Sequence, residues 1–207
     1  MAQQLSRISV LSPTNHELAE EGSYFTAKNP AAGTGLATIA ALTTLADVSP
    51  FALVKSGATK PVRLDFMRLV CTAAGTGGTE LRFAVRTDAT KADPTGGTAL
   101  ARVNVNQGST AAADATMFAG ALAAVAASGT MREPMAVLLK SAIPAVGDTF
   151  LIKFGCADMG VGSSAGTVYI GAPPIIIGAS QLAAFHIWLP GQALASSFEI
   201  TLGFWER

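Results

Sequence analysis

The sequence predicts an all-β protein, an antiparallel β-sandwich with a jelly-roll-like arrangement. Short segments in which apolar and polar residues alternate recur along most of the chain, which is the period of half-buried strands. Clusters of glycine and proline separate these segments, and no long segment has the period of a helix. The clearest alternation lies in 197–205, which places Phe198, Ile200, Leu202 and Phe204 on one side. These observations indicate roughly eight to ten short strands in two layers.

Residues 1–48 differ from the rest of the chain, and we expect them to form an extended N-terminal arm. An acidic stretch at 17–21 precedes turn signals at 29–35. Such a segment would pack on the body or on a neighbouring molecule, and an ordinary irregular start is the alternative. Residues 49–207 are then expected to form the β-sandwich body.

The body contains candidate strands separated by turn residues. In chain order, these strands are expected at 51–55, 61–71, 80–87, 99–106, 116–125, 131–140, 149–155 and 173–177. In the second of them, Phe66 is expected to face inward together with Val62. The alanines of 116–125 would also suit a helix. The glycine run at 75–78 predicts a hairpin connection, and 160–166 predicts a flexible loop.

The last two expected strands, 181–189 and 197–205, are expected to face each other across a turn at Pro190-Gly191. The first of them has apolar residues on both faces, so we expect it to be buried from both sides. It therefore marks a place where a second layer or a second copy of the chain packs.

The composition suggests a protein whose surface is partly covered. Half of the 207 residues are apolar, only 14% are charged, and the net charge is zero. A soluble monomer with so few charges would lie close to its solubility limit, which favours assembly with further copies or with a larger particle. A neutral surface of small residues is the alternative. The balanced charge and the absence of a Lys/Arg cluster argue against nucleic-acid binding.

Two further features bear on the compartment. The alanine-rich stretch 111–127 is too weakly apolar to predict a membrane span, and the first residues lack the apolar core of a signal peptide. We expect no membrane contact. Cys71 and Cys156 could pair across two strands, although reduced cysteines are favoured.

The sequence contains no recognisable catalytic or metal-binding pattern, so we expect neither enzyme activity nor a cofactor or metal. The histidines are His16 and His186, and there is no Cys-x-x-Cys or histidine pair. Four residues on the last two strands are instead candidate interface residues: Phe185, His186, Trp188 and Trp205. Alternatively, the two tryptophans could line a sugar-binding face, although interior or interface packing is favoured.

The closing third carries a likeness to a known group of proteins. The segments PPIIIG at 173–178, HIWLP at 186–190, SFEI at 197–200 and GFWER at 203–207 carry this likeness, together with VCTAAGTGG at 70–78. With them the chain resembles small structural proteins of tailed bacteriophage virions, most closely capsid decoration (cement) proteins. The resemblance brings no functional residues with it.

The resemblance implies a homotrimer with a jelly-roll-like body on the outer capsid surface of the virion, made in the host cytoplasm. Such a protein stabilises the shell by bridging subunits of the major capsid protein, and its arm would clamp a neighbour. The alternative is a trimeric head-fibre or tail domain that binds host-surface carbohydrate. A jelly-roll hydrolase or isomerase is the third possibility, against which the missing histidine clusters weigh.

Overall fold

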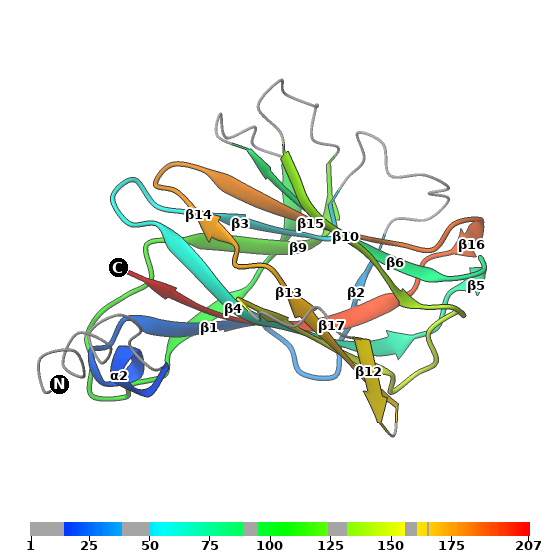
Figure 1. Ribbon diagram of the computed structural model, residues 1–207, viewed down its shortest axis with the longest axis horizontal. Coiled ribbons are helices and arrows are strands. Elements are labelled where there is room, and N and C mark those ends of the chain that lie inside the picture. The colour runs from blue at the N-terminus through cyan, green and yellow to red at the C-terminus, as the bar shows by residue number, and fades with distance from the viewer. Residues whose placement is uncertain (1–14, 39–49, 89–94, 124–131, 156–160, 165) are drawn as a thin grey trace, which may run out of the picture.

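The computed structural model describes residues 15–38, 50–88, 95–123, 132–155, 161–164 and 166–207. Figure 1 shows two layers of β-strands that face each other, with the short helix α2 (Asn15–Glu20) beside β1. This arrangement confirms the predicted all-β sandwich. Within the described residues, one sheet has nine strands and the facing sheet has six.

The nine-stranded sheet, here called the large sheet, is built around two long central strands. Its order is β12 (Val161–Ser164), β13 (Thr167–Ala172), β11 (Thr149–Phe154), β4 (Val62–Ala73), β17 (Ser197–Glu206), β1 (Tyr24–Lys28) and β8 (Ala101–Asn104). In addition, β14 (Ile176–Ile177) pairs with β4 and β2 (Leu36–Ala37) pairs with β17. Its pairs are antiparallel except for β11 and β13, which run parallel.

The six-stranded sheet, here called the small sheet, covers one face of the large sheet. Its order is β10 (Arg132–Lys140), β6 (Leu81–Asp88), β15 (Leu182–Trp188), β3 (Ala52–Lys55), β9 (Thr116–Leu122) and β7 (Gly96–Ala99). A separate pair joins β16 (Gln192–Leu194) to β5 (Thr76–Gly77). The ambiguous segment 116–125 is thus extended over 116–122.

The core lies between the two sheets and is rich in phenylalanine. Phe198 of β17 packs edge-on against Phe150 of β11 and against Phe51, which precedes β3 in the facing layer; the ring centroids are 6.4 and 6.1 Å apart. Phe185 of β15 stacks on Phe83 of β6 at 6.3 Å. All five side chains are at most 2% exposed. Because side chains alternate along a strand, these residues all lie on the side of their strand that faces the other sheet. The two apolar faces then pack together and form the sandwich.

At two places where a hairpin was predicted, the chain instead passes from one sheet to the other. β15 belongs to the small sheet and β17 to the large one, so the turn at Pro190-Gly191 does not join pairing strands. The residues after that turn form β16 and pair with β5 instead. In the same way the glycine run 75–78 connects β4 in one sheet to β6 in the other. Turn residues mark where the chain bends, but the strand that it pairs with afterwards is decided by tertiary packing.

The N-terminal region differs from the expected arm over 1–48, because part of it is an interior strand of the body. β1 lies between β17 and β8, with Phe25 paired to Phe204 on one side and to Asn104 on the other. Phe25 and Ala27 point into the core and are 3% and 0% exposed. The burial of these side chains and hydrogen bonding along both edges hold the strand in place. Residues 1–14 and 39–49 lie outside the described residues.

Two other expected segments also differ from the sequence-based prediction. The expected strand 99–106 divides at the buried Leu100 into β7 of the small sheet and β8 of the large sheet, so the chain crosses between layers there. Part of the expected loop 160–166 forms β12, which pairs with β13. An edge strand such as β12 needs only backbone hydrogen bonds to one neighbour, and the apolar pattern therefore does not reveal it.

Candidate functional site

The four predicted interface residues do not form one surface. Phe185 lies in the core between the sheets, where it also contacts Phe154 edge-on at 6.4 Å. His186 and Trp188 point to the opposite side of β15, which we call the outer face of the small sheet. Trp205 lies on the outer face of the large sheet, the face turned away from the small sheet. The structure therefore brings together only His186 and Trp188.

The centre of the outer face of the small sheet, around β15, is buried within the chain, whereas Leu138 of β10 on the same face is 41% exposed. Leu53, Leu182 and Ala184 pack together there and are at most 1% exposed, and His186 and Trp188 are 2% and 5% exposed. Every residue of β15 is buried, which confirms the prediction that this strand is covered on both sides. These residues are packed side chains of a single chain rather than an exposed interface.

His186 is a buried histidine without a polar partner among the described residues. Neither Nδ1 nor Nε2 accepts or donates a hydrogen bond. Burial and, to a smaller extent, the nearby Arg86 guanidinium together lower the pKa of the imidazole from 6.5 to about 4. The ring is therefore neutral at pH 7 and behaves as an apolar side chain.

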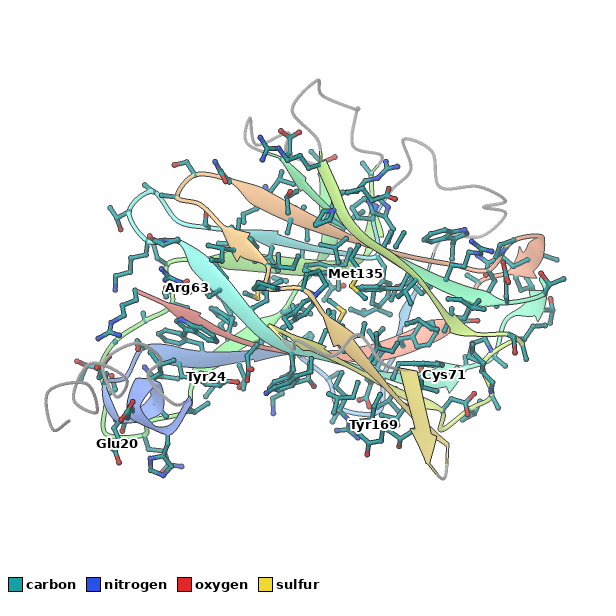
Figure 2. The ribbon with its side chains drawn as sticks, in the orientation of Figure 1. Glu20, Tyr24, Arg63, Cys71, Met135 and Tyr169 are labelled. Carbon is teal, nitrogen blue, oxygen red and sulfur yellow. The ribbon has the colours of Figure 1, made fainter. Side chains whose placement is uncertain are left out.

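The outer face of the large sheet is, in contrast, partly open to solvent. Trp205 is partly exposed and lies across from Tyr24 of β1 and Arg63 of β4. At the other end of the sheet Tyr169 of β13 is 49% exposed, and Figure 2 shows it below β13, away from the small sheet. On β8 at the opposite edge, Val103 is 50% exposed. This face offers aromatic and apolar contact area to a partner.

A β-bulge sets which side chains reach this face. Gly203 pairs with Phe66 and the next residue, Phe204, pairs with Leu64, so Asp65 is the extra residue of β4. The bulge reverses the alternation, and Phe66 points outward, whereas the sequence predicted that it faces inward. The ring lies over Gly203, where an added Cβ would come within 2.2 Å of Phe66 Cε1. A glycine inside an apolar strand is the signal that could have indicated this bulge.

Asp65 organises the polar groups beside this bulge. Its Oδ2 accepts a hydrogen bond of 2.6 Å from the Tyr24 hydroxyl, and its Oδ1 lies 2.8 Å from Lys153 Nζ. Burial, followed by the hydrogen bond to Asp65, raises the pKa of the Tyr24 hydroxyl, which therefore stays protonated and donates. The carboxylate is only 6% exposed and is neutralised by Lys153.

Several cations of the same face have no such neutralisation. Lys28, Arg63 and Arg68 take part in none of the ion pairs found among the described residues. Arg63 Nη1 is buried without a hydrogen-bond partner. The protein as a whole is neutral, but this face carries positive charge that the described residues do not compensate.

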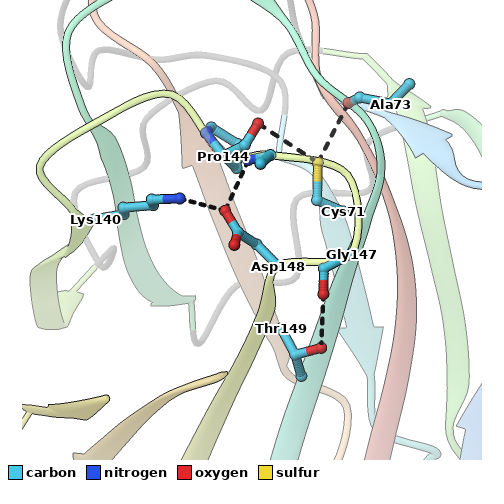
Figure 3. A network of polar contacts seen from close by, with 8 residues as sticks. Cys71, Ala73, Lys140, Pro144, Gly147, Asp148 and Thr149 are labelled. Atoms are coloured by element: carbon cyan, nitrogen blue, oxygen red, sulfur yellow. Dashed lines mark hydrogen bonds and ion pairs between the residues drawn. The ribbon is translucent and has the colours of Figure 1, made fainter. Parts of the chain in front are cut away.

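Cys71 is a buried free thiol near the end of β4 (Figure 3). Its Sγ lies 3.4 Å from the carbonyl oxygen of Ala73 and 3.9 Å from that of Pro144. Burial raises the pKa of the thiol, and the Asp148 carboxylate raises it further. Asp148 in turn accepts hydrogen bonds from Lys140 Nζ and from the Ala145 backbone. Cys71 therefore acts as a packing residue beside a turn; Cys156 lies outside the described residues.

Among the described residues, no group of three or more His, Cys, Asp or Glu side chains could hold a metal ion. The same part of the chain contains no helix with the length and hydrophobicity of a membrane span. No family model, curated protein or solved structure matches the chain.

Proposed function

We propose that this chain is a structural virion protein that decorates a bacteriophage capsid and stabilises it by bridging major capsid protein subunits. One observation carries the proposal: the outer face of the large sheet is partly exposed and combines aromatic side chains, Trp205 and Tyr169, with the unpaired cations Lys28 and Arg68. Aromatic residues and arginine are enriched where proteins contact proteins. The partner surface would lie against this face.

Two features of the sequence support the same proposal. Only 14% of the residues are charged, which favours a protein that is held in an assembly. The closing segments resemble capsid decoration proteins, which implies a homotrimer on the outer capsid surface. A trimer would multiply the contacts with the shell and raise the overall affinity without changing any single contact.

The proposal is tested with shells assembled from the cognate major capsid protein but lacking this chain. We expect the purified protein to sediment with the shells in a saturable manner, to form a trimer in analytical ultracentrifugation, and to raise the temperature at which the shells disassemble. A charge placed on the proposed face, Tyr169→Glu, should weaken the binding at least tenfold.

The matched control is Leu194→Glu on β16, because Leu194 is 62% exposed and lies off the large sheet. This variant should bind as the unmodified protein does. A monomer that leaves the shells bare would refute the proposed function. Equal loss in both variants would exclude the outer face of the large sheet as the contact surface.

Carbohydrate binding by a head-fibre or tail domain is the second candidate, and the open aromatic face favours it. Trp205, Phe66 and Tyr169 are the accessible aromatic residues of that face. Trp188 is buried and does not contribute to a sugar-binding surface together with Trp205. Binding on a glycan array that disappears in Trp205→Ala would favour this function over shell decoration.

A further inference from the structure

A hollow of about 170 Å³ opens in the outer face of the large sheet, where β1, β17 and β4 lie side by side. Lys28, Thr201 and Arg68 line it and face one another directly across the three strands, since Lys28 pairs with Thr201 and Thr201 pairs with Arg68. A hydroxyl group thus lies between two cationic side chains in one cross-strand row.

The spacing of the sheet lets both cations reach the same point. Neighbouring strands lie about 4.8 Å apart, so the Cα atoms of Lys28 and Arg68 are about 10 Å apart across the row. Both side chains are longer than half of that distance, and both are exposed. They can close over an anion that rests on the Thr201 hydroxyl.

The two cations of this hollow form no ion pair with the described residues. Lys28 and Arg68 take part in no ion pair there. Glu199 also lines the hollow and offsets part of this charge, but its Oε1 accepts a hydrogen bond from the Gly33 backbone and contacts neither cation, so the cations outnumber the carboxylates there. By comparison, Lys153 is 2.8 Å from Asp65 and Arg86 is 3.2 Å from Glu133. Two neighbouring unpaired cations with a hydroxyl between them are the arrangement that an anion would complete.

The wall of the hollow is held in place before any ligand binds. The Asn29 backbone N–H donates to the Ile200 carbonyl at 3.3 Å, and its Oδ1 accepts from the Ile200 N–H at 2.8 Å. Its Nδ2 donates to the Thr34 carbonyl at 2.8 Å. Pro30, with its restricted backbone, follows on the same wall. A preformed wall lowers the ordering cost of binding.

We propose that this hollow binds a tetrahedral oxyanion, the group found in phosphate and sulfate esters. Arg68 donates two N–H groups to its oxygens, Lys28 contributes a compact positive charge, and the Thr201 hydroxyl donates a third contact. The site stands on its own geometry and does not depend on the proposed role in a virion.

The test is an NMR titration of the whole protein with inorganic phosphate and, separately, inorganic sulfate, at constant ionic strength maintained with sodium chloride. We expect saturable changes in the amide signals of Lys28, Arg68 and Thr201. Lys28→Ala and Arg68→Ala should each weaken the binding at least fivefold, and Thr201→Val should weaken it less. Saturation by only one of the two anions supports the site and identifies which ester the natural ligand carries.

Lys60→Ala and Arg132→Ala are the matched controls, since both residues are exposed and also lack an ion pair among the described residues. They should bind both anions as the unmodified protein does. The proposal is overturned if sodium chloride or acetate gives the same saturable shifts, or if the controls weaken binding as much as Arg68→Ala. Because each variant's spectrum reports its fold, loss of binding through unfolding is recognised directly. Shell binding is judged by Tyr169→Glu, which lies outside the hollow, so the two proposals fail separately.

Discussion

The outer faces of the two sheets differ, although the inner faces of both contribute to one core. At the centre of the small sheet, Leu53, Leu182 and His186 are at most 2% exposed, whereas at the centre of the large sheet Arg68 is exposed and Trp205 is partly exposed. The difference follows from the strands themselves. β15 is apolar at almost every position, while β17 alternates apolar with polar residues. The pattern along a whole strand therefore shows whether one face or both are covered, which a single apolar residue does not.

Replacing the two tryptophans should give the largest difference in the free energy of unfolding between the two faces. Trp188→Ala should lower the free energy of unfolding by about 3–5 kcal/mol, because it leaves a large cavity on a closed face. Trp205→Ala removes the same group from a partly exposed position and should cost about 1–2 kcal/mol. Urea denaturation of the two variants measures both values. Equal costs would contradict the assignment of one closed and one open face.

Acid should destabilise the closed face through His186. Its pKa is about 4 in the folded protein and 6.5 in the unfolded chain, so the unfolded state binds the proton first as the pH falls. Stability should therefore decline from pH 6.5 to pH 4 and become level below that, with a total loss of about 3 kcal/mol from this group.

The variant His186→Leu isolates this contribution. It removes two unpaired ring nitrogens, so it should be at least as stable as the unmodified protein at pH 7. Denaturation curves at pH 7, 5.5 and 4 should show a shallower pH dependence for His186→Leu, because other groups titrate equally in both proteins. The same slope in both proteins would show that His186 accepts a proton without unfolding.

A substitution at Gly203 tests the packing on the open face, and we expect it to have a smaller effect on the free energy of unfolding. Gly203→Ala places a Cβ within 2.2 Å of Phe66 Cε1 and 2.7 Å of the Tyr24 hydroxyl, and the ring must move. We expect a loss of about 1–2 kcal/mol, which becomes smaller but does not vanish when Phe66→Ala is already present, because the Tyr24 hydroxyl still crowds the added Cβ. A double-mutant cycle measured by urea denaturation checks this coupling. Additive losses would show that Phe66 does not cover the glycine in solution.

Much of the fold could be predicted because alternation is a local property of the chain. The segments 61–71, 80–87, 131–140, 149–155 and 197–205 all contain strands close to their expected limits. Pairing is not local, so the sequence does not show which strands pair. β15 and β17 were expected to face each other across a turn, but they lie in different sheets. β1 was hidden in the expected arm because five residues between turn signals give too short a pattern.

The candidate site could be predicted only in part. The burial of His186 and Trp188 followed from the apolar pattern on both faces of 181–189, but the separation of Trp205 from them depends on which sheet each strand joins. The hollow could not be predicted because Lys28, Arg68 and Thr201 are far apart in the sequence. Each of them taken alone is an ordinary surface residue. They become a group only when β17 lies between β1 and β4.

The position of β17 also has a consequence for how the chain folds. This strand pairs with β4 along one edge and with β1 along the other, and it follows both of them by more than a hundred residues in sequence. Until it emerges from the ribosome, β1 and β4 cannot be joined in one sheet, and each leaves an edge with unpaired backbone groups. Completion of the large sheet should therefore be slow. During that interval the two waiting edges are the places where misassembly between nascent chains would begin.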